Sequence, residues 1–139
     1  MEKKSEINMD VEIGNKLIAE FMGGRYFEIG GIMGTTYQYR DLIHKGDYYY
    51  PNELKYHTSW DWLMPVVDKI EKLGFDSRIH GNNSDDGYLC DFLESNTNNE
   101  ISCFVTWQDS GGTKIQATYK AVVQYIKWYN ENKNNNHGK

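Results

Sequence analysis

The sequence predicts an α+β fold: a single domain whose mostly antiparallel sheet, with a C-terminal three-stranded meander, packs against about three helices. Two observations lead to this class. The stretch 56–74 repeats apolar residues every three or four positions, as a helix with one buried face does. Between residues 75 and 108 the pattern changes to alternating apolar and polar residues, which is typical of strands with one face in the core.

The stretch 56–74 has both a start and a stop signal of a helix. Thr58 suits the N-terminal cap, and Asp61 places a carboxylate near the positive helix end. Pro65 agrees if the helix starts only a few residues before it, because proline is tolerated in the first turn. Gly74 offers the left-handed residue that closes many helices. The predicted buried stripe is Leu63, Val66, Val67, Ile70 and Leu73.

Two further helices are predicted at the ends of the domain. The first has an apolar stripe from Val11 to Met22, ends at Gly23, and should be regular only from Asn15, because Gly14 weakens a helix by about 1 kcal/mol relative to alanine. The last is capped by Thr113 and extends to about residue 130. Its predicted inner stripe is Ile115, Tyr119, Val122, Val123, Ile126 and Tyr129.

Polar composition sets the limits of the domain. Residues 1–8 are predicted to be a disordered leader, residues 9–130 the single α+β domain, and the asparagine-rich residues 131–139 a disordered tail. Apolar segments long enough to cross a membrane and an N-terminal signal-peptide pattern are both absent from the sequence. We therefore expect a cytoplasmic protein without a membrane association.

The strands fall into a clear group and a weak group. Segments 75–80, 88–94 and 100–108 alternate well and are separated by turn residues, which predicts the meander. Segment 25–29 is rich in aromatic and branched residues, as strands are. Segments 35–43 and 48–56 have moderate strand propensity but poor periodicity, and residues 44–47 between them are interpreted as a turn. The glycines at 30, 31 and 34 are also interpreted as a turn, because the lysine and Ser/Thr of a phosphate-binding loop do not follow.

Composition argues against several classes of function, although it leaves a local basic patch open. The net charge of −5 argues against general nucleic-acid binding, which needs a basic face. Cys90 and Cys103 are too few for a disulfide scaffold and are expected to be buried thiols in a reducing compartment. The four histidines share no short ligand spacing, so neither a metal site nor a cofactor is predicted.

Catalysis has one candidate pair. His57 and Asp61 could be one helical turn apart, close enough for the carboxylate to orient the imidazole as a general base. The alternative is helix capping and local hydrogen bonding, which a helix start requires anyway. With no identifiable nucleophile or oxyanion-binding signature, the favoured interpretation is that the protein is not an enzyme, and no catalytic residue is assigned.

Aromatic residues are the strongest candidates for a binding surface. Tyrosine offers a rigid contact area with a polar tip, which suits interfaces, but an irregular aromatic cover over the core explains the same segment. Trp60 and Trp62 are two positions apart at a helix start and should diverge, so Trp60 either recognises a partner or packs under the tyrosines. The candidate binding residues are Tyr37, Tyr39, Arg40, Tyr48, Tyr49, Tyr50, His57 and Trp60.

The outer face of the meander is an alternative ligand-binding face. Arg78, His80 and Asp91 are expected on it and could form a polar pocket. A solvated polar face is the ordinary alternative for an antiparallel sheet.

Three segments, one in each predicted helix, support a resemblance. They are Asn15-Lys16-Leu17-Ile18-Ala19-Glu20-Phe21-Met22-Gly23, Tyr56-His57-Thr58-Ser59-Trp60-Asp61-Trp62-Leu63-Met64-Pro65-Val66-Val67 and Tyr119-Lys120-Ala121-Val122-Val123-Gln124-Tyr125-Ile126-Lys127-Trp128-Tyr129-Asn130. In these segments the chain resembles a group of small, mostly uncharacterised proteins encoded by bacteriophages and Bacteroidetes genomes. The resemblance implies an accessory protein of a phage or mobile element that works inside a bacterial cell, and it assigns no site residue.

Three functional hypotheses follow. The first is a non-enzymatic binding module that engages a host protein, such as a host-defence component, through the tyrosine-rich segment. The second is a binder of, or enzyme for, a small nucleotide-like ligand, with aromatic rings stacking a base and Arg40 or Arg78 meeting a phosphate. The third is a structural role with self-association through exposed aromatic residues.

Overall fold

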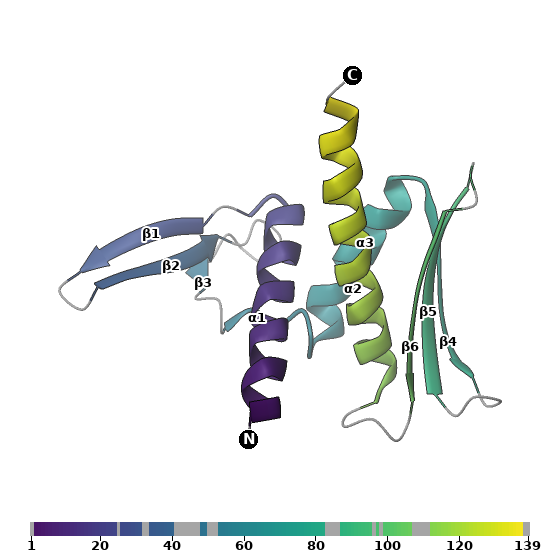
Figure 1. Ribbon diagram of the computed structural model, residues 1–139, viewed down its shortest axis with the longest axis horizontal. Helices are drawn as coiled ribbons and strands as arrows, with labels where there is room; N and C mark the ends of the chain where they lie inside the picture. The colour runs from purple at the N-terminus through teal and green to yellow at the C-terminus, as the bar shows by residue number, and fades with distance from the viewer. Residues whose placement is uncertain are drawn as a thin grey trace. The chain divides into compact units, whose positions relative to one another are not determined.

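Over the residues that it describes, the computed structural model has an α+β architecture with three helices and antiparallel sheets (Figure 1). The chain divides into two compact units, Met1–Lys55 and Tyr56–Lys139. The predicted bounds of one domain, 9–130, stay a prediction. The structure describes residues 2–24, 26–31, 34–40, 48–49, 53–82, 87–95, 97, 99–106 and 112–137.

The first unit begins with helix α1, Glu2–Phe21. It closes as predicted at Gly23, whose φ of 86° is left-handed. The Gly23 N–H donates to the Glu20 carbonyl (3.0 Å) and the Gly24 N–H to the Ala19 carbonyl (2.8 Å), so a Schellman motif satisfies the last carbonyls.

Helix α1 also includes residues 2–8, which the sequence assigns to a disordered leader. Glutamate and lysine, which dominate these first positions, are good helix formers. The helix continues through Gly14 because a single glycine costs only about 1 kcal/mol in a helix interior. Gly14 and Asn15 are buried, and the Asn15 amide donates to the Leu54 carbonyl (3.2 Å), which ties the end of the unit to its helix.

The rest of the first unit is a small antiparallel sheet of strands β1 (Tyr26–Gly31), β2 (Gly34–Arg40) and β3 (Tyr48–Tyr49), in that order. Gly31 pairs with Gly34, so the glycine cluster lies at the β1–β2 connection, where the sequence places a turn. The predicted turn at 44–47 lies outside the described residues.

The second unit begins with helix α2, Trp60–Lys72. Its N-cap is Ser59 rather than the predicted Thr58, and the Ser59 side chain makes no capping hydrogen bond. Asp61 lies in the first turn as expected, but Pro65 is inside the helix and not in its first turn. The proline is tolerated because the packed apolar face, rather than local propensity, supplies most of a helix's stability.

Helix α2 ends at the predicted glycine. Gly74 has a φ of 103°, and its N–H donates to the Glu71 carbonyl (3.0 Å). Leu63, Val66, Val67 and Ile70 are buried as the stripe predicts. Leu73 is 43% exposed, because it follows the last helical residue and leaves the buried stripe.

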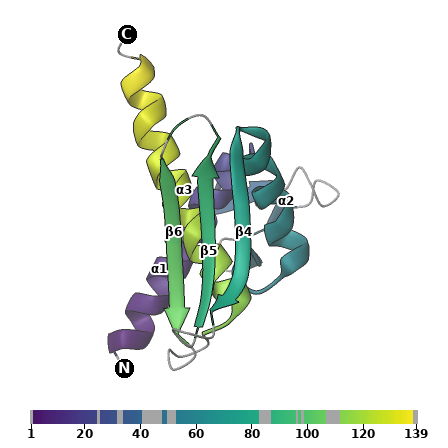
Figure 2. The same cartoon turned by 90° about the vertical axis from the view of Figure 1, so that its right-hand side faces the viewer.

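The meander of the second unit is confirmed. Strands β4 (Phe75–Asn82), β5 (Gly87–Glu94) and β6 (Glu100–Thr106) are antiparallel and lie in chain order. Helices α2 and α3 (Lys114–His137) lie on one side of this sheet, and Figure 2 shows its other face toward the viewer.

The core of the second unit lies between the sheet and the helices. It includes Phe92 and Val105 from the strands and Val122, Tyr125 and Ile126 from α3, all at most 1% exposed. Phe75 meets Tyr125 edge to face, with 4.9 Å between ring centroids and 82° between ring planes. Such aromatic pairs add about 0.5–1.5 kcal/mol beyond the burial of their surface. Of the predicted α3 stripe, Tyr119, Val122 and Ile126 are buried, whereas Ile115, Val123 and Tyr129 are partly exposed.

Helix α3 begins where the sequence predicts and continues past the predicted end. The Thr113 hydroxyl accepts the Gln116 N–H (3.2 Å), which confirms the cap. The helix extends to His137 and so includes most of the segment assigned to a disordered tail. The Asn132 amide donates to the Trp128 carbonyl (2.8 Å), and Lys133 places a positive charge near the negative helix end, so both favour continuation.

Candidate functional site

The tyrosine-rich candidate site lies on the sheet of the first unit. Tyr37, Tyr39 and Arg40 belong to β2, and Tyr48 and Tyr49 to β3, whereas Tyr50 lies outside the described residues. In the register of this sheet, Tyr39 is opposite Tyr26 on one side and Tyr49 on the other. Arg40 is opposite Tyr48. The sheet thus brings the backbone positions of these residues together.

His57 and Trp60, the other two predicted binding residues, belong to the second unit. Trp60 is 37% exposed and Trp62 only 8%, so the two tryptophans diverge as their spacing predicts. Trp62 packs edge to face on Tyr56 (5.2 Å between centroids). The His57 ring lies 6.1 Å from the Tyr119 ring, and burial lowers the pKa of His57.

The alternative ligand face contains one close ion pair. Arg78 and Asp91 are register partners on β4 and β5, and Arg78 Nη2 lies 3.1 Å from Asp91 Oδ2. The Asp91 side chain is only 5% exposed, and its Oδ1 has no hydrogen-bond partner among the described residues. His80 lies two positions further along β4 and is exposed. Of the three predicted residues, Arg78 and Asp91 therefore form a pair between β4 and β5, and His80 lies on β4 outside this pair.

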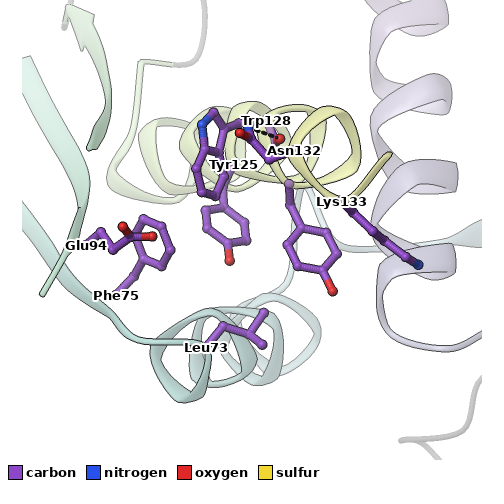
Figure 3. A pocket seen from close by; sticks show the side chains of 8 residues that line it. Leu73, Phe75, Glu94, Tyr125, Trp128, Asn132 and Lys133 are labelled. Carbon is purple, nitrogen blue, oxygen red and sulfur yellow. Dashed lines mark hydrogen bonds between the residues drawn. The ribbon is translucent and has the colours of Figure 1, made fainter. Parts of the chain in front are cut away.

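A pocket of about 320 Å³ lies at the end of the meander, and the sequence does not predict it. Four elements of the second unit contribute: the end of α2, the start of β4, the end of β5 and the last turns of α3. Figure 3 shows the side chains around the cavity. Its lining residues are Leu73, Phe75, Glu94, Tyr125, Trp128, Tyr129, Asn132 and Lys133.

Aromatic rings form one wall of this pocket. Phe75 lies 5.5 Å from Trp128, with 75° between the ring planes, in addition to its contact with Tyr125. Tyr125 and Tyr129 are stacked at 6.1 Å with 23° between planes. Tyr125 is 1% exposed, whereas Trp128 and Tyr129 are partly exposed, so these two offer the accessible part of the wall.

Opposite charges lie at two places around the pocket. The Glu94 carboxylate accepts a hydrogen bond from the Thr97 hydroxyl. Burial raises the pKa of the neighbouring Tyr125 to about 12, and the charges of Tyr129 and Glu94 raise it in the same direction. The pKa of Lys69 on α2 is lowered, mainly by burial and to a smaller extent by the nearby positive charge of Lys133. Asn132 is less available to a ligand, because its amide donates to the backbone of its own helix (Figure 3).

Comparison with known proteins identifies no relative: neither a family model, nor a curated protein, nor a solved structure matches the chain.

Two searches of the described part of the chain are also negative. Its helices include none that is long and apolar enough to cross a membrane. Its histidine, cysteine and acidic side chains form no cluster of three or more that could hold a metal ion.

Proposed function

We propose that the protein is a non-enzymatic binding module of a phage or mobile element, which acts in the cytoplasm of a bacterial host on a host protein. The observation that carries this proposal is the row of tyrosines at matched positions, Tyr26, Tyr39 and Tyr49, across the sheet of the first unit. Tyrosine is enriched at protein interfaces because it supplies a large contact area at a low cost in conformational entropy.

Arg40 supports a recognition role for this sheet, and Trp60 is a separate candidate contact on the second unit. Arg40 is opposite Tyr48, next to the tyrosine row, and arginine and tyrosine are the residues that most often dominate binding energy. In the second unit, Trp60 leaves 37% of its surface exposed. A host-defence component is the kind of partner that the phage context favours.

The test is a pull-down from host lysate with the tagged protein and a Tyr39→Ser/Tyr49→Ser variant. The matched control is Leu93→Ala, which shortens an exposed apolar side chain on the other unit's sheet. We expect the tyrosine variant to lose a host protein that the wild type and Leu93→Ala retain, while all three keep the same circular dichroism spectrum. Equal capture by all three proteins would refute the site.

A second candidate function, binding of a small molecule, is favoured by the pocket of the second unit. Its volume of about 320 Å³ is at the lower end of the range of about 300–1,000 Å³ for ligand sites, and it combines aromatic rings with a carboxylate and an ammonium group. A thermal-shift screen tests this function, because a ligand that binds only the folded state raises the unfolding temperature.

A further inference from the structure

We infer that the pocket of the second unit binds a guanine nucleotide, with the base against the aromatic wall, its N–H groups at Glu94 and its phosphate at Lys133. This inference rests on the small-molecule function proposed above. It assigns a ligand to residues that the tyrosine-rich site does not include.

The wall selects a flat ring. Trp128 and Tyr129 are partly exposed, and each packs against a buried ring, Trp128 against Phe75 and Tyr129 against Tyr125. Figure 3 shows Leu73 on the α2 side of the cavity and Tyr125 on the α3 side, so an aliphatic side chain faces the helix that carries the aromatic rings. Stacking of a nucleobase on an aromatic side chain needs no particular base, because every base has a flat π-face.

Glu94 supplies the base selectivity. A carboxylate only accepts hydrogen bonds, so it matches an edge with adjacent donors. Guanine presents two such donors, N1–H and the 2-amino group, whereas adenine presents only its 6-amino group beside ring acceptors. The Thr97 hydroxyl bonds to Oε1 of Glu94 and holds the carboxylate in place, and a carboxylate has further acceptor positions for the base.

Lys133 suits the phosphate. Tyr125 lies close to Glu94, and Lys133 follows it by eight residues along α3, so the backbone positions of Tyr125 and Lys133 are about 12 Å apart along the helix axis. A nucleoside monophosphate has a comparable length from its base edge to its phosphate. The nearby charge of Lys69 adds to the attraction for an anion.

The charge of Lys133 argues against an organic cation as the ligand, because its ammonium group would repel a second positive charge in the pocket.

The experiment is isothermal titration of the full chain with GMP, AMP, guanosine and inorganic phosphate. We expect GMP to bind more tightly than AMP by about tenfold or more, which is the scale of one charge-assisted hydrogen bond. Glu94→Gln should remove this preference. Lys133→Ala should weaken the affinity for GMP by about tenfold and leave the affinity for guanosine unchanged. The matched control is Lys127→Ala, which removes an exposed lysine of α3 that does not line the pocket and should change neither affinity.

Three outcomes contradict the inference, and they separate it from the function on which it rests. Equal binding of GMP and AMP, or a GMP preference that survives Glu94→Gln, refutes the guanine assignment but leaves a small-molecule site. Binding of phosphate alone with the same affinity as GMP refutes the role of the aromatic wall. If neither these ligands nor a wider panel of aromatic acids binds, the small-molecule function itself is refuted.

Discussion

His57 illustrates how a single side chain can couple folding to pH. Its ring is half-buried next to Tyr119, and this burial lowers its pKa below the ordinary value of 6.5. The folded state therefore favours the neutral imidazole more than the unfolded state does. As the pH falls through 6.5, the unfolded chain takes up the proton first, which lowers the free energy of unfolding.

We predict that the free energy of unfolding decreases between pH 7.5 and pH 5 with a component that a His57→Gln variant lacks. Urea denaturation across this range, with both proteins measured in the same buffers, checks the difference in slope. The contribution of His57 should be fully present above pH 6.5 and be lost as the pH falls toward the lowered pKa. Parallel curves for the two proteins would show that burial of His57 does not perturb its titration.

Single residues also show where sequence reasoning stops. Glu94 is at the end of a correctly predicted strand, but nothing in its local pattern says that α3 brings the rings of residues 125–129 beside it. Lys133 lies in the segment 131–139, whose asparagine-rich composition predicts a disordered tail, whereas α3 extends to His137. The spacing of Tyr125, Trp128 and Tyr129, three and four residues apart, was a usable signal for an aromatic helix face.

Among the elements, the meander depends on one close approach between strands. A Cβ atom added to Gly87 at the start of β5 would clash with the backbone carbonyl oxygen of Val105 and lie 2.6 Å from Cζ of Phe104. Glycine is therefore required for β5 and β6 to pair in this register. Gly81 on β4 is different, because the nearest atom to an added Cβ is Cε1 of Tyr88 at 3.7 Å, an ordinary contact.

We predict that Gly87→Ala lowers the free energy of unfolding by about 1–3 kcal/mol, because the strands must separate to relieve the overlap. Gly81→Ala is the matched control and should be neutral or stabilising by up to about 1 kcal/mol, since alanine loses less backbone entropy on folding. Denaturant unfolding of the two variants measures both values. Equal stabilities would mean that β5 and β6 do not approach as closely as described.

The elements predicted well are those in which one periodicity dominates. Helix α2 and the three strands of the meander each have one buried face, and their apolar residues recur at 3.6 or at 2 positions. Residues 26–31, 34–40 and 48–49 form strands too, but glycines and clustered tyrosines blur the alternation there, so the pairing of these strands does not follow from the sequence. Helix ends were less certain because capping groups compete over one or two positions, as Ser59 and Thr58 do.

At the scale of the whole molecule, the two cysteines report on opening of the second unit. Cys90 and Cys103 are free and are register partners on β5 and β6. Burial raises the pKa of Cys90 to about 12, although a hydrogen bond with Thr118 of α3 lowers this pKa by a smaller amount. Burial also raises the pKa of Cys103. Because the thiolate is the reactive form, both groups should be protected while helix and sheet stay together.

We predict that a thiol reagent at pH 8 modifies the native protein at least about tenfold more slowly than the protein in urea, because the thiolate fraction is suppressed. Cys103, which is partly exposed, should react before the fully buried Cys90. The variants Cys90→Ser and Cys103→Ser assign the two rates. Immediate reaction of Cys90 in the native protein would show that α3 does not cover the sheet in solution.

The ion pair between Arg78 and Asp91 has a consequence for how this sequence can evolve. Asp91 is nearly buried and its only described ionic partner is Arg78, whose side chain is 62% exposed, so loss of Arg78 alone leaves an uncompensated buried carboxylate at a cost, reduced by solvent screening, of about 1–3 kcal/mol. Replacement of both residues by apolar ones of similar volume is often neutral or stabilising. Descendant lineages should therefore keep the pair intact or exchange both positions together, and an ancestor with a lone Asp91 would have been counter-selected.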